Sequence, residues 1–147
     1  MDLYERLRGH EGLRLQVYDD ATGLPIQQGT LVKGFPTIGY GALLCEPGGI
    51  TPAEAETLLR NRVELAVAGV RALVPNMRAA NDARFDVLVE MAFQMGVGGL
   101  AKFGNTLRAV SEKRWDDAAD GMLASLWARQ TPRRAQELAM IMRSGQA

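Results

Sequence analysis

The feature that most constrains the fold is a change of sequence pattern near residue 50. Residues 19–41 hold seven glycines and prolines between short β-forming runs at 30–32 and 37–38. Turn formers that alternate with β formers in this way predict a small antiparallel sheet with hairpin turns. From Thr51 onward the apolar residues follow helical spacing instead. The pattern therefore predicts an α+β fold whose strands all lie in the N-terminal part.

The chain is predicted to begin with a short amphipathic helix. Asp2 and Glu5 form a capping-box pattern, and Gly12 is placed to end the helix. Helical spacing predicts that its buried face contains Leu3, Tyr4 and Leu7. A half-buried strand over 13–18 is predicted next, because apolar residues alternate there at Leu13, Leu15 and Val17.

A long helix is predicted to follow the sheet. Thr51 is its N-cap, Pro52 takes the first helical position and Glu54 completes a second capping box. Apolar spacing continues the helix to about Leu73, and Pro75 follows. A helix of this length can connect a sheet lobe to a helical lobe.

The remainder of the chain is predicted to be helical. We expect helices over 82–95, 105–112 and 116–126, with a last helix from Pro132 to about Met142, and we expect the glycines at 96, 98 and 99 to break the first of these. The expected organisation is one domain over residues 1–147. Its parts are a first helix and small antiparallel sheet lobe (1–50), a long connecting helix (51–74) and a larger all-helical lobe (75–147).

Composition excludes several functional classes. The 147 residues are 47% apolar and 23% charged, which is ordinary for a globular domain. Seventeen basic and seventeen acidic residues cancel, so we expect no nucleic-acid partner. There is no signal-peptide pattern and no apolar run that could span a bilayer, so we expect synthesis in the cytoplasm without stable membrane insertion.

The cysteine and histidine content narrows the chemistry further. One cysteine excludes an internal disulfide, and Cys45 is expected to pack as a small apolar residue. His10 is the only histidine and is expected to be exposed, which excludes metal sites built from several imidazoles. We therefore expect neither a metal nor a cofactor.

Two acids flank the junction of the first helix and the first strand. Glu11 ends the predicted helix and Asp20 follows the predicted strand, so the two lie on different elements. Glycoside hydrolysis uses such a pair, one acid protonating the leaving oxygen and one carboxylate activating water or stabilising the cationic transition state. Plainer interpretations exist: Glu11 as a solvated helix-end acid, Asp19 and Asp20 as turn residues, and Thr37 as an ordinary strand residue.

Several motifs in the chain resemble one known family. His-Glu-Gly-Leu-Arg-Leu-x-x-Tyr-x-Asp at 10–20 and Thr-Ile-Gly-Tyr-Gly at 37–41 are similar to the active-site signature of the phage-type lysozymes, or endolysin muramidases. Further similar motifs follow in the family's order at 91–96, 103–108, 113–119 and 130–135. The resemblance implies a lysozyme-like fold and hydrolysis of the β-1,4 bond between N-acetylmuramic acid and N-acetylglucosamine in bacterial peptidoglycan.

The resemblance also assigns catalytic roles by position. It implies that Glu11 is the general acid, that Asp20 is the carboxylate that activates water, and that Thr37 is the hydroxyl that helps to hold this water. Asp20 is preferred to Asp19 because Tyr-x-Asp matches the motif. The family favours inversion of configuration at the cleaved bond, for which the carboxyl groups stand about 6.5–9.5 Å apart.

Four residues of the helical lobe are expected to contact the substrate. Phe93 and Gln94 match positions that line the family's sugar cleft, and an amide such as Gln94 suits an N-acetyl group. Arg134 matches the arginine that pairs with the catalytic Glu. Met91 is expected to be a core residue first and a pliable groove lining second.

The chain departs from the family pattern chiefly at an insertion over about 24–34, which predicts a longer hairpin. Two other functions stay open: a lytic transglycosylase that leaves 1,6-anhydro sugars, and a non-catalytic wall-binding or virion-structural module. For the muramidase we expect a monomer, made in the host bacterial cytoplasm, that reaches the wall after a holin permeabilises the membrane.

Overall fold

A computed structural model describes residues 2–44, 48–77 and 82–147. The chain divides into two units, Met1–Glu56 and Thr57–Ala147, which are described separately below. The first holds one complete helix, a small antiparallel sheet and the start of a long helix, and the second is helical, so the predicted α+β class is confirmed. Cys45 and part of the loop that follows it lie outside the described residues.

The first helix, α1 (Leu3–Glu11), forms because both of its ends are capped locally. The Glu5 N–H donates to Asp2 Oδ1 at 2.8 Å, and the Asp2 N–H donates back to Glu5 Oε2 at 3.0 Å. Gly12 adopts a φ of +66°, and its N–H donates to the Arg8 carbonyl. The predicted capping box and helix end are therefore confirmed.

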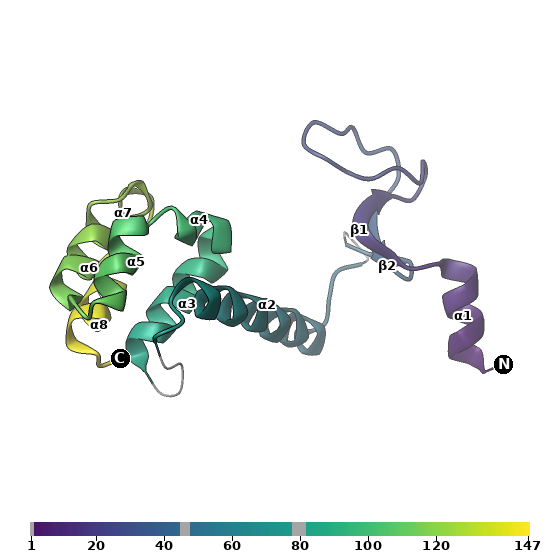
Figure 1. Ribbon diagram of the computed structural model, residues 1–147. Coiled ribbons are helices and arrows are strands. Elements are labelled where there is room, and N and C mark those ends of the chain that lie inside the picture. The colour runs from purple at the N-terminus through teal and green to yellow at the C-terminus, as the bar shows by residue number, and fades with distance from the viewer. Residues whose placement is uncertain (1, 45–47, 78–81) are drawn as a thin grey trace. The chain divides into compact units, whose positions relative to one another are not determined.

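The predicted buried face of α1 is wrong. Its three apolar side chains, Leu3, Tyr4 and Leu7, are exposed, by 56%, 68% and 44%. The reason is that α1 runs away from the strands (Figure 1), and no described element of the first unit covers that face. His10, on the same helix, is exposed as predicted.

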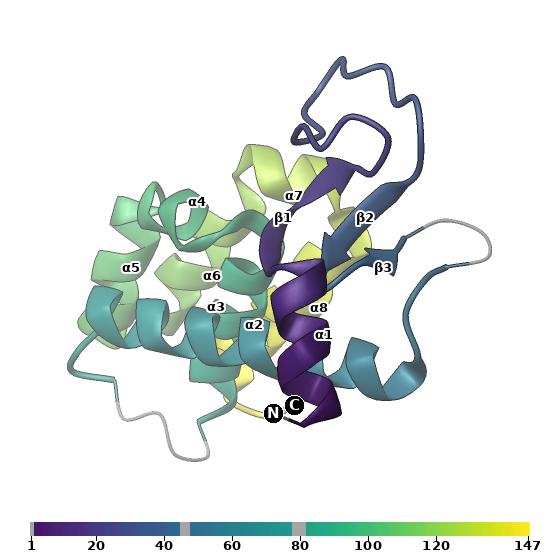
Figure 2. The ribbon, with the colours of Figure 1, turned by 90° about the vertical axis from the view of Figure 1, so that its right-hand side faces the viewer.

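The sheet has three antiparallel strands in the order β1 (Arg14–Asp19), β2 (Pro36–Gly39) and β3 (Ala42–Leu43), as Figure 2 shows. Thr37 on the central strand pairs with Tyr18 of β1 and with Leu43 of β3. The prediction of a small antiparallel sheet is confirmed, but two details are wrong. Residues 30–32 form no strand, and strand structure continues past residue 41 into β3.

The first unit has no described apolar side chain that is fully buried. Leu13 and Leu15, predicted to be half-buried, are 53% and 80% exposed. They are exposed because no described second layer covers the sheet within this unit. The two buried side chains among its described residues are polar, Asp19 and Thr37. Hydrogen bonds therefore hold this sheet and its long connection together locally.

The long helix α2 (Pro52–Leu73) matches its prediction. Thr51 Oγ1 accepts from the Glu54 N–H at 3.3 Å, and Glu54 Oε2 accepts from the Thr51 N–H at 2.8 Å, which completes the capping box. The C-terminal half of α2 contributes Ala66 and Val70 to the core of the second unit.

Six further helices make up the rest of the second unit: α3 (Ala83–Met95), α4 (Val97–Ala101), α5 (Gly104–Ser111), α6 (Trp115–Leu123), α7 (Leu126–Gln130) and α8 (Pro132–Ser144). Their positions agree in outline with the predicted helical segments, but the single helix predicted over 116–126 is wrong, since α6 ends at Leu123 and α7 begins at Leu126. Gly96 does end α3, but Gly98 and Gly99 lie inside the short helix α4 and do not break it.

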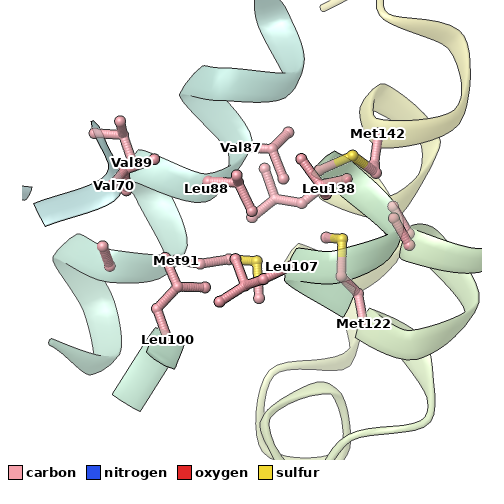
Figure 3. Close-up of a cluster of buried hydrophobic side chains, with 14 of the residues drawn as sticks. Val70, Val87, Leu88, Val89, Met91, Leu100, Leu107, Met122, Leu138 and Met142 are labelled. Carbon is pink, nitrogen blue, oxygen red and sulfur yellow. The ribbon is translucent and has the colours of Figure 1, made fainter. Parts of the chain in front are cut away.

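The core of the protein lies in this second unit. Figure 3 shows the cluster of buried apolar side chains between its helices, and Leu88, Met91, Leu100, Met122 and Met142 are fully buried. Burial of this apolar surface is what stabilises the helices, since isolated helices of their length are marginal in water. Among the described residues, no helix has the length and hydropathy needed to cross a bilayer.

Candidate active site

The backbone of Phe35 connects two of the predicted catalytic residues. Its N–H donates to Asp20 Oδ1 at 2.6 Å, while its carbonyl accepts from the Asp20 N–H at 3.1 Å and from the Thr37 hydroxyl at 3.0 Å. Asp20 and Thr37 are seventeen positions apart in the sequence. Both hydrogen-bond to the backbone of Phe35, which directly precedes β2, and are thereby held close to it.

This arrangement leaves particular atoms of both residues available. Asp20 is exposed, and its Oδ2 has no hydrogen-bond partner among the described residues. Thr37 is buried, and its hydroxyl proton is used in the bond to Phe35, so its oxygen can only accept. A water molecule could therefore donate to the exposed Asp20 Oδ2, which is the chemistry that a water-activating carboxylate requires. The Thr37 oxygen keeps its capacity to accept but is buried.

Asp19 differs from its neighbour Asp20 in every one of these respects. Its side chain is 2% exposed and accepts three backbone N–H groups: from Lys33 at 2.7 Å on Oδ2, and from Gly34 at 2.9 Å and Ala21 at 3.0 Å on Oδ1. The Lys33 hydrogen bond is the main reason that the pKa of Asp19 lies below its usual value. Burial opposes this shift, and smaller contributions from the Gly34 and Ala21 N–H groups and the Thr22 side chain lower the pKa further. A carboxylate so stabilised is a poor proton acceptor.

Glu11 ends α1 beside the turn that follows β2. A methyl group added at Gly41 would lie 2.9 Å from Glu11 Oε2, so the carboxylate packs directly against this glycine. Gly41 has a φ of +78°, and a side chain there would be both strained and obstructed. Glu11 and Gly41 line a pocket of about 470 Å³ together with Tyr4, Leu7, Arg8 and Tyr40.

The side chain of Glu11 is free to act on a ligand. Its carboxylate has no hydrogen bond or ion pair with the described part of the chain, and the residue is exposed. No hydrogen bond joins it to Asp20 within those residues either. Glu11 thus ends α1 and Asp20 directly follows β1, and each acid keeps at least one unbonded oxygen. Asp20 is not among the residues that line the Glu11 pocket.

In the second unit, Gln94 and Arg134 line one pocket of about 400 Å³ with Thr131, Pro132 and Arg133. Gln94 Oε1 accepts from the indole N–H of Trp127 at 2.9 Å. Because the amide oxygen faces Trp127, the amide NH₂ group points the other way and can donate to a ligand. Arg134 Nε lies 3.5 Å from Glu90 Oε1, and both side chains are about half exposed.

The other two predicted contacts lie elsewhere in the second unit. Phe93 is 43% exposed and lines a separate groove of about 200 Å³ with residues of α2, α3 and α4. Met91 is fully buried in the core. The structure thus gives Met91 the core role and not the groove-lining role, because its position on α3 faces the neighbouring helices.

Sequence reasoning missed the parts played by Phe35, Gly34 and Asp19. Phe35 acts through its backbone, so its side chain carries no signal. Gly34 gave no local signal either, because its φ is ordinary and glycine is needed there only to avoid a collision with Asp20 Oδ1 and Ala21, which lie far away in the sequence. For Asp19 the sequence predicts a turn residue, and its side chain does accept the Ala21 N–H, but its bonds to Lys33 and Gly34 could not be predicted.

Comparison with known proteins identifies close sequence similarity over most of the chain. A family model described as phage lysozyme matches residues 8–143. The pre-baseplate central spike protein Gp5 of Enterobacteria phage T4 is 34% identical over 99% of this chain, and a probable T4-type lysozyme 1 of Dictyostelium discoideum is 29% identical over 96%. A peptidoglycan hydrolase, gp36 of Pseudomonas phage phiKMV, is 31% identical over 90%.

These relatives differ greatly in length. The aligned region spans 28% of the T4 spike protein and 14% of the phiKMV hydrolase, but 93% of the Dictyostelium lysozyme. The similarity therefore concerns a unit that occurs both as nearly a whole protein and as one part of much longer ones.

Proposed function

This chain belongs to the phage lysozyme family, and we propose that it is a muramidase that hydrolyses the β-1,4 bond between N-acetylmuramic acid and N-acetylglucosamine in bacterial peptidoglycan. The family membership confirms the resemblance recognised in the motifs at 10–20 and 37–41. Relatives that carry the names lysozyme and peptidoglycan hydrolase support the proposed glycoside hydrolase activity.

The observation that carries the proposal is the pairing of Asp20 and Thr37 through Phe35, with Asp20 Oδ2 left unbonded. Asp20 would remove a proton from the attacking water, and Thr37 would accept a hydrogen bond from this water and so orient it. Glu11 would donate its proton to the glycosidic oxygen as the bond to the sugar breaks. We propose inversion of configuration, as the family resemblance favours.

The second unit would supply contacts to the sugars and their substituents. The outward NH₂ group of Gln94 suits an acetamido carbonyl, and the exposed ring of Phe93 offers an apolar surface to a sugar face. Arg134, in the same pocket as Gln94, would provide a cation for acceptor groups of the substrate. Met91 supports these residues from the core and is not proposed as a contact.

Digestion of purified peptidoglycan with product analysis tests the proposal. We expect new reducing N-acetylmuramic acid ends in the mass spectrum, and the α-anomer as the first product in NMR. Products with 1,6-anhydro ends would instead assign a lytic transglycosylase, and reducing N-acetylglucosamine ends would assign cleavage of the other bond.

The role of Glu11 has its own test. Glu11→Gln should lower turnover about 10²- to 10⁴-fold, the usual contribution of general acid catalysis. His10→Asn changes the adjacent exposed residue and should retain the parent activity. A Glu11→Gln variant that clears cell walls as fast as the parent would refute the assignment.

The similarity to a T4 protein named a central spike protein favours a second candidate, a lysozyme-like module of a virion particle. A module that binds the wall without cutting it would sediment with peptidoglycan and release no muropeptides. Release that depends on Glu11 would exclude the non-catalytic form of this candidate.

We also propose that residues 1–147 act as one lysozyme-like domain and as a monomer, and that a holin gives access to the wall. Sedimentation equilibrium should give the mass of a single chain. Expression in a bacterial host should cause lysis only when a holin is produced with it, and lysis without a holin would contradict this part of the proposal.

A further inference from the structure

The long connection between β1 and β2 is anchored by one side chain. Asp19 ends β1, and its carboxylate accepts N–H groups from both limbs of the connection: Ala21 on the first limb, and Lys33 and Gly34 on the second. Its carbonyl accepts from the Gly23 N–H at 2.7 Å, and its own N–H donates to the Leu24 carbonyl at 3.0 Å. These hydrogen bonds bring the beginning and the end of the connection together at the end of β1.

The second limb leads directly to Asp20. Lys33 and Gly34, held by Asp19, are followed by Phe35, whose N–H donates to Asp20 Oδ1 and whose carbonyl accepts from the Asp20 N–H. Gly34 packs against Asp20 Oδ1 so closely that no Cβ could be accommodated there. The placement of Asp20 therefore depends on where residues 33–35 lie.

We propose that Asp19 is a positioning residue for catalysis, which fixes the 33–35 segment so that Asp20 presents its unbonded Oδ2 to the attacking water. The inference rests on the proposed function, in which Asp20 is the base. It extends that function to a residue that contacts neither substrate nor water and acts only through its neighbour.

The geometry separates this role from direct catalysis by Asp19. Its two oxygens already accept three backbone N–H groups, so neither is left unbonded to take a proton from water. Few apolar contacts hold the connection in place, since Leu24, Leu31 and Phe35 are all exposed. The described hydrogen bonds that hold the second limb are therefore those from Lys33 and Gly34 to Asp19, and the pair between Phe35 and Asp20.

Asp19→Asn is the informative variant. It keeps the size of the side chain but turns one acceptor into an NH₂ group, which must face at least one backbone N–H that now lacks a partner. We expect kcat on peptidoglycan to fall about 10- to 100-fold, the scale of misplacing a reacting group by about 1 Å, with KM within about twofold of the parent.

A double-mutant cycle distinguishes positioning from general loss of structure. If Asp19 acts through Asp20, the Asp19→Asn/Asp20→Asn variant should be no slower than Asp20→Asn alone, to within about twofold. Independent effects would multiply, and multiplication would overturn the inference. Unchanged kcat in Asp19→Asn would overturn it as well.

Thr30→Ala is the matched control. Thr30 Oγ1 accepts from the Gln27 N–H at 2.9 Å in the same connection, and the described hydrogen bonds of the Asp19 and Asp20 side chains are to other residues. This variant should loosen the tip of the loop and retain the parent kcat. A comparable loss of kcat in Thr30→Ala would show that loop order in general, and not Asp19, is what matters.

Two further measurements make every outcome decisive. If Asp19→Asn does not fold, Gly34→Ala tests whether the position of Asp20 relative to residues 33–35 matters, because the added methyl group displaces Asp20 Oδ1. An unchanged kcat in Gly34→Ala would then refute the inference. Asp20→Asn, assayed in parallel, tests the proposed function itself. Full activity in Asp20→Asn refutes the base assignment, whereas an inactive Asp20→Asn beside a fully active Asp19→Asn refutes only the positioning role.

Discussion

The indole N–H of Trp127 donates to Gln94 Oε1 at 2.9 Å, and so joins the end of α3 to α7. Trp127 is itself fixed, since it is 7% exposed and packs edge-on against Phe103 at a centroid distance of 6.4 Å. The orientation of the Gln94 amide is therefore set by the fold before any ligand binds, with its donors directed away from Trp127.

Trp127→Phe should release this amide. The variant removes the N–H donor and leaves a smaller ring, so we expect a loss of about 1–3 kcal/mol in unfolding free energy and a rise in KM of about threefold or more. Trp115→Phe is the control, because that indole packs under Arg84 and does not contact Gln94. Urea denaturation measures the change in unfolding free energy, and steady-state kinetics measure KM. An unchanged KM would show that the orientation of the Gln94 amide does not contribute to substrate binding.

Asp19 should make stability depend on pH in the acid range. Its pKa is lowered in the folded protein, chiefly by the Lys33 N–H, so the unfolded chain binds more protons and stability rises with pH. The contribution is complete above the unfolded value of about 3.9 and is lost as pH falls through the lower folded pKa.

Melting temperatures of the parent and of Asp19→Asn test this expectation. The difference between the two proteins should be largest at neutral pH and should shrink below about pH 4. Glu54, whose pKa is lowered mainly by the Thr51 N–H, acts with the same sign, so Glu54→Gln measures its share separately. A constant difference from pH 2 to pH 7 would contradict the assignment for Asp19.

Leu88 should be among the most costly residues to truncate. It is fully buried between helices of the second unit (Figure 3), and Leu88→Ala is expected to lower the unfolding free energy by about 2–5 kcal/mol through lost burial and a residual cavity. Leu65→Ala removes the same atoms from a side chain that is 71% exposed, and should stay within about 0.5 kcal/mol of the parent. Similar losses in the two variants would show that Leu65 is covered in solution.

Arg84 should stabilise the C-terminal end of α8. Its Nε donates to the Met142 carbonyl at 2.8 Å, a second guanidinium nitrogen donates to the Arg143 carbonyl at 2.9 Å, and its cation lies 4.4 Å from the Trp115 ring centroid. We expect Arg84→Gln to lower the unfolding free energy by about 2–4 kcal/mol. Arg133 is an exposed arginine at the other end of α8, and Arg133→Gln should change the unfolding free energy little when measured by urea denaturation.

The sequence by itself determined the features that depend on residues close together along the chain. The capping boxes at Asp2–Glu5 and at Thr51–Glu54 and the end of α1 at Gly12 follow from hydrogen bonds and backbone preferences within three or four residues. Such interactions form in a short segment whatever the rest of the chain does, so residue types at fixed spacing predict them. The motif around Glu11, Asp20 and Thr37 is likewise a matter of residue types at fixed spacing, and it identifies the family from sequence alone.

Tertiary structure alone decided which atoms of the site are free. Asp19 is buried and Asp20 is open because the N–H groups of Lys33 and Gly34 return to Asp19 from fourteen and fifteen residues away. Gln94 is oriented by an indole thirty-three residues further on. Burial and hydrogen-bond partners of this kind depend on how distant segments meet in space, and the sequence pattern of one segment carries no information about its partner's position.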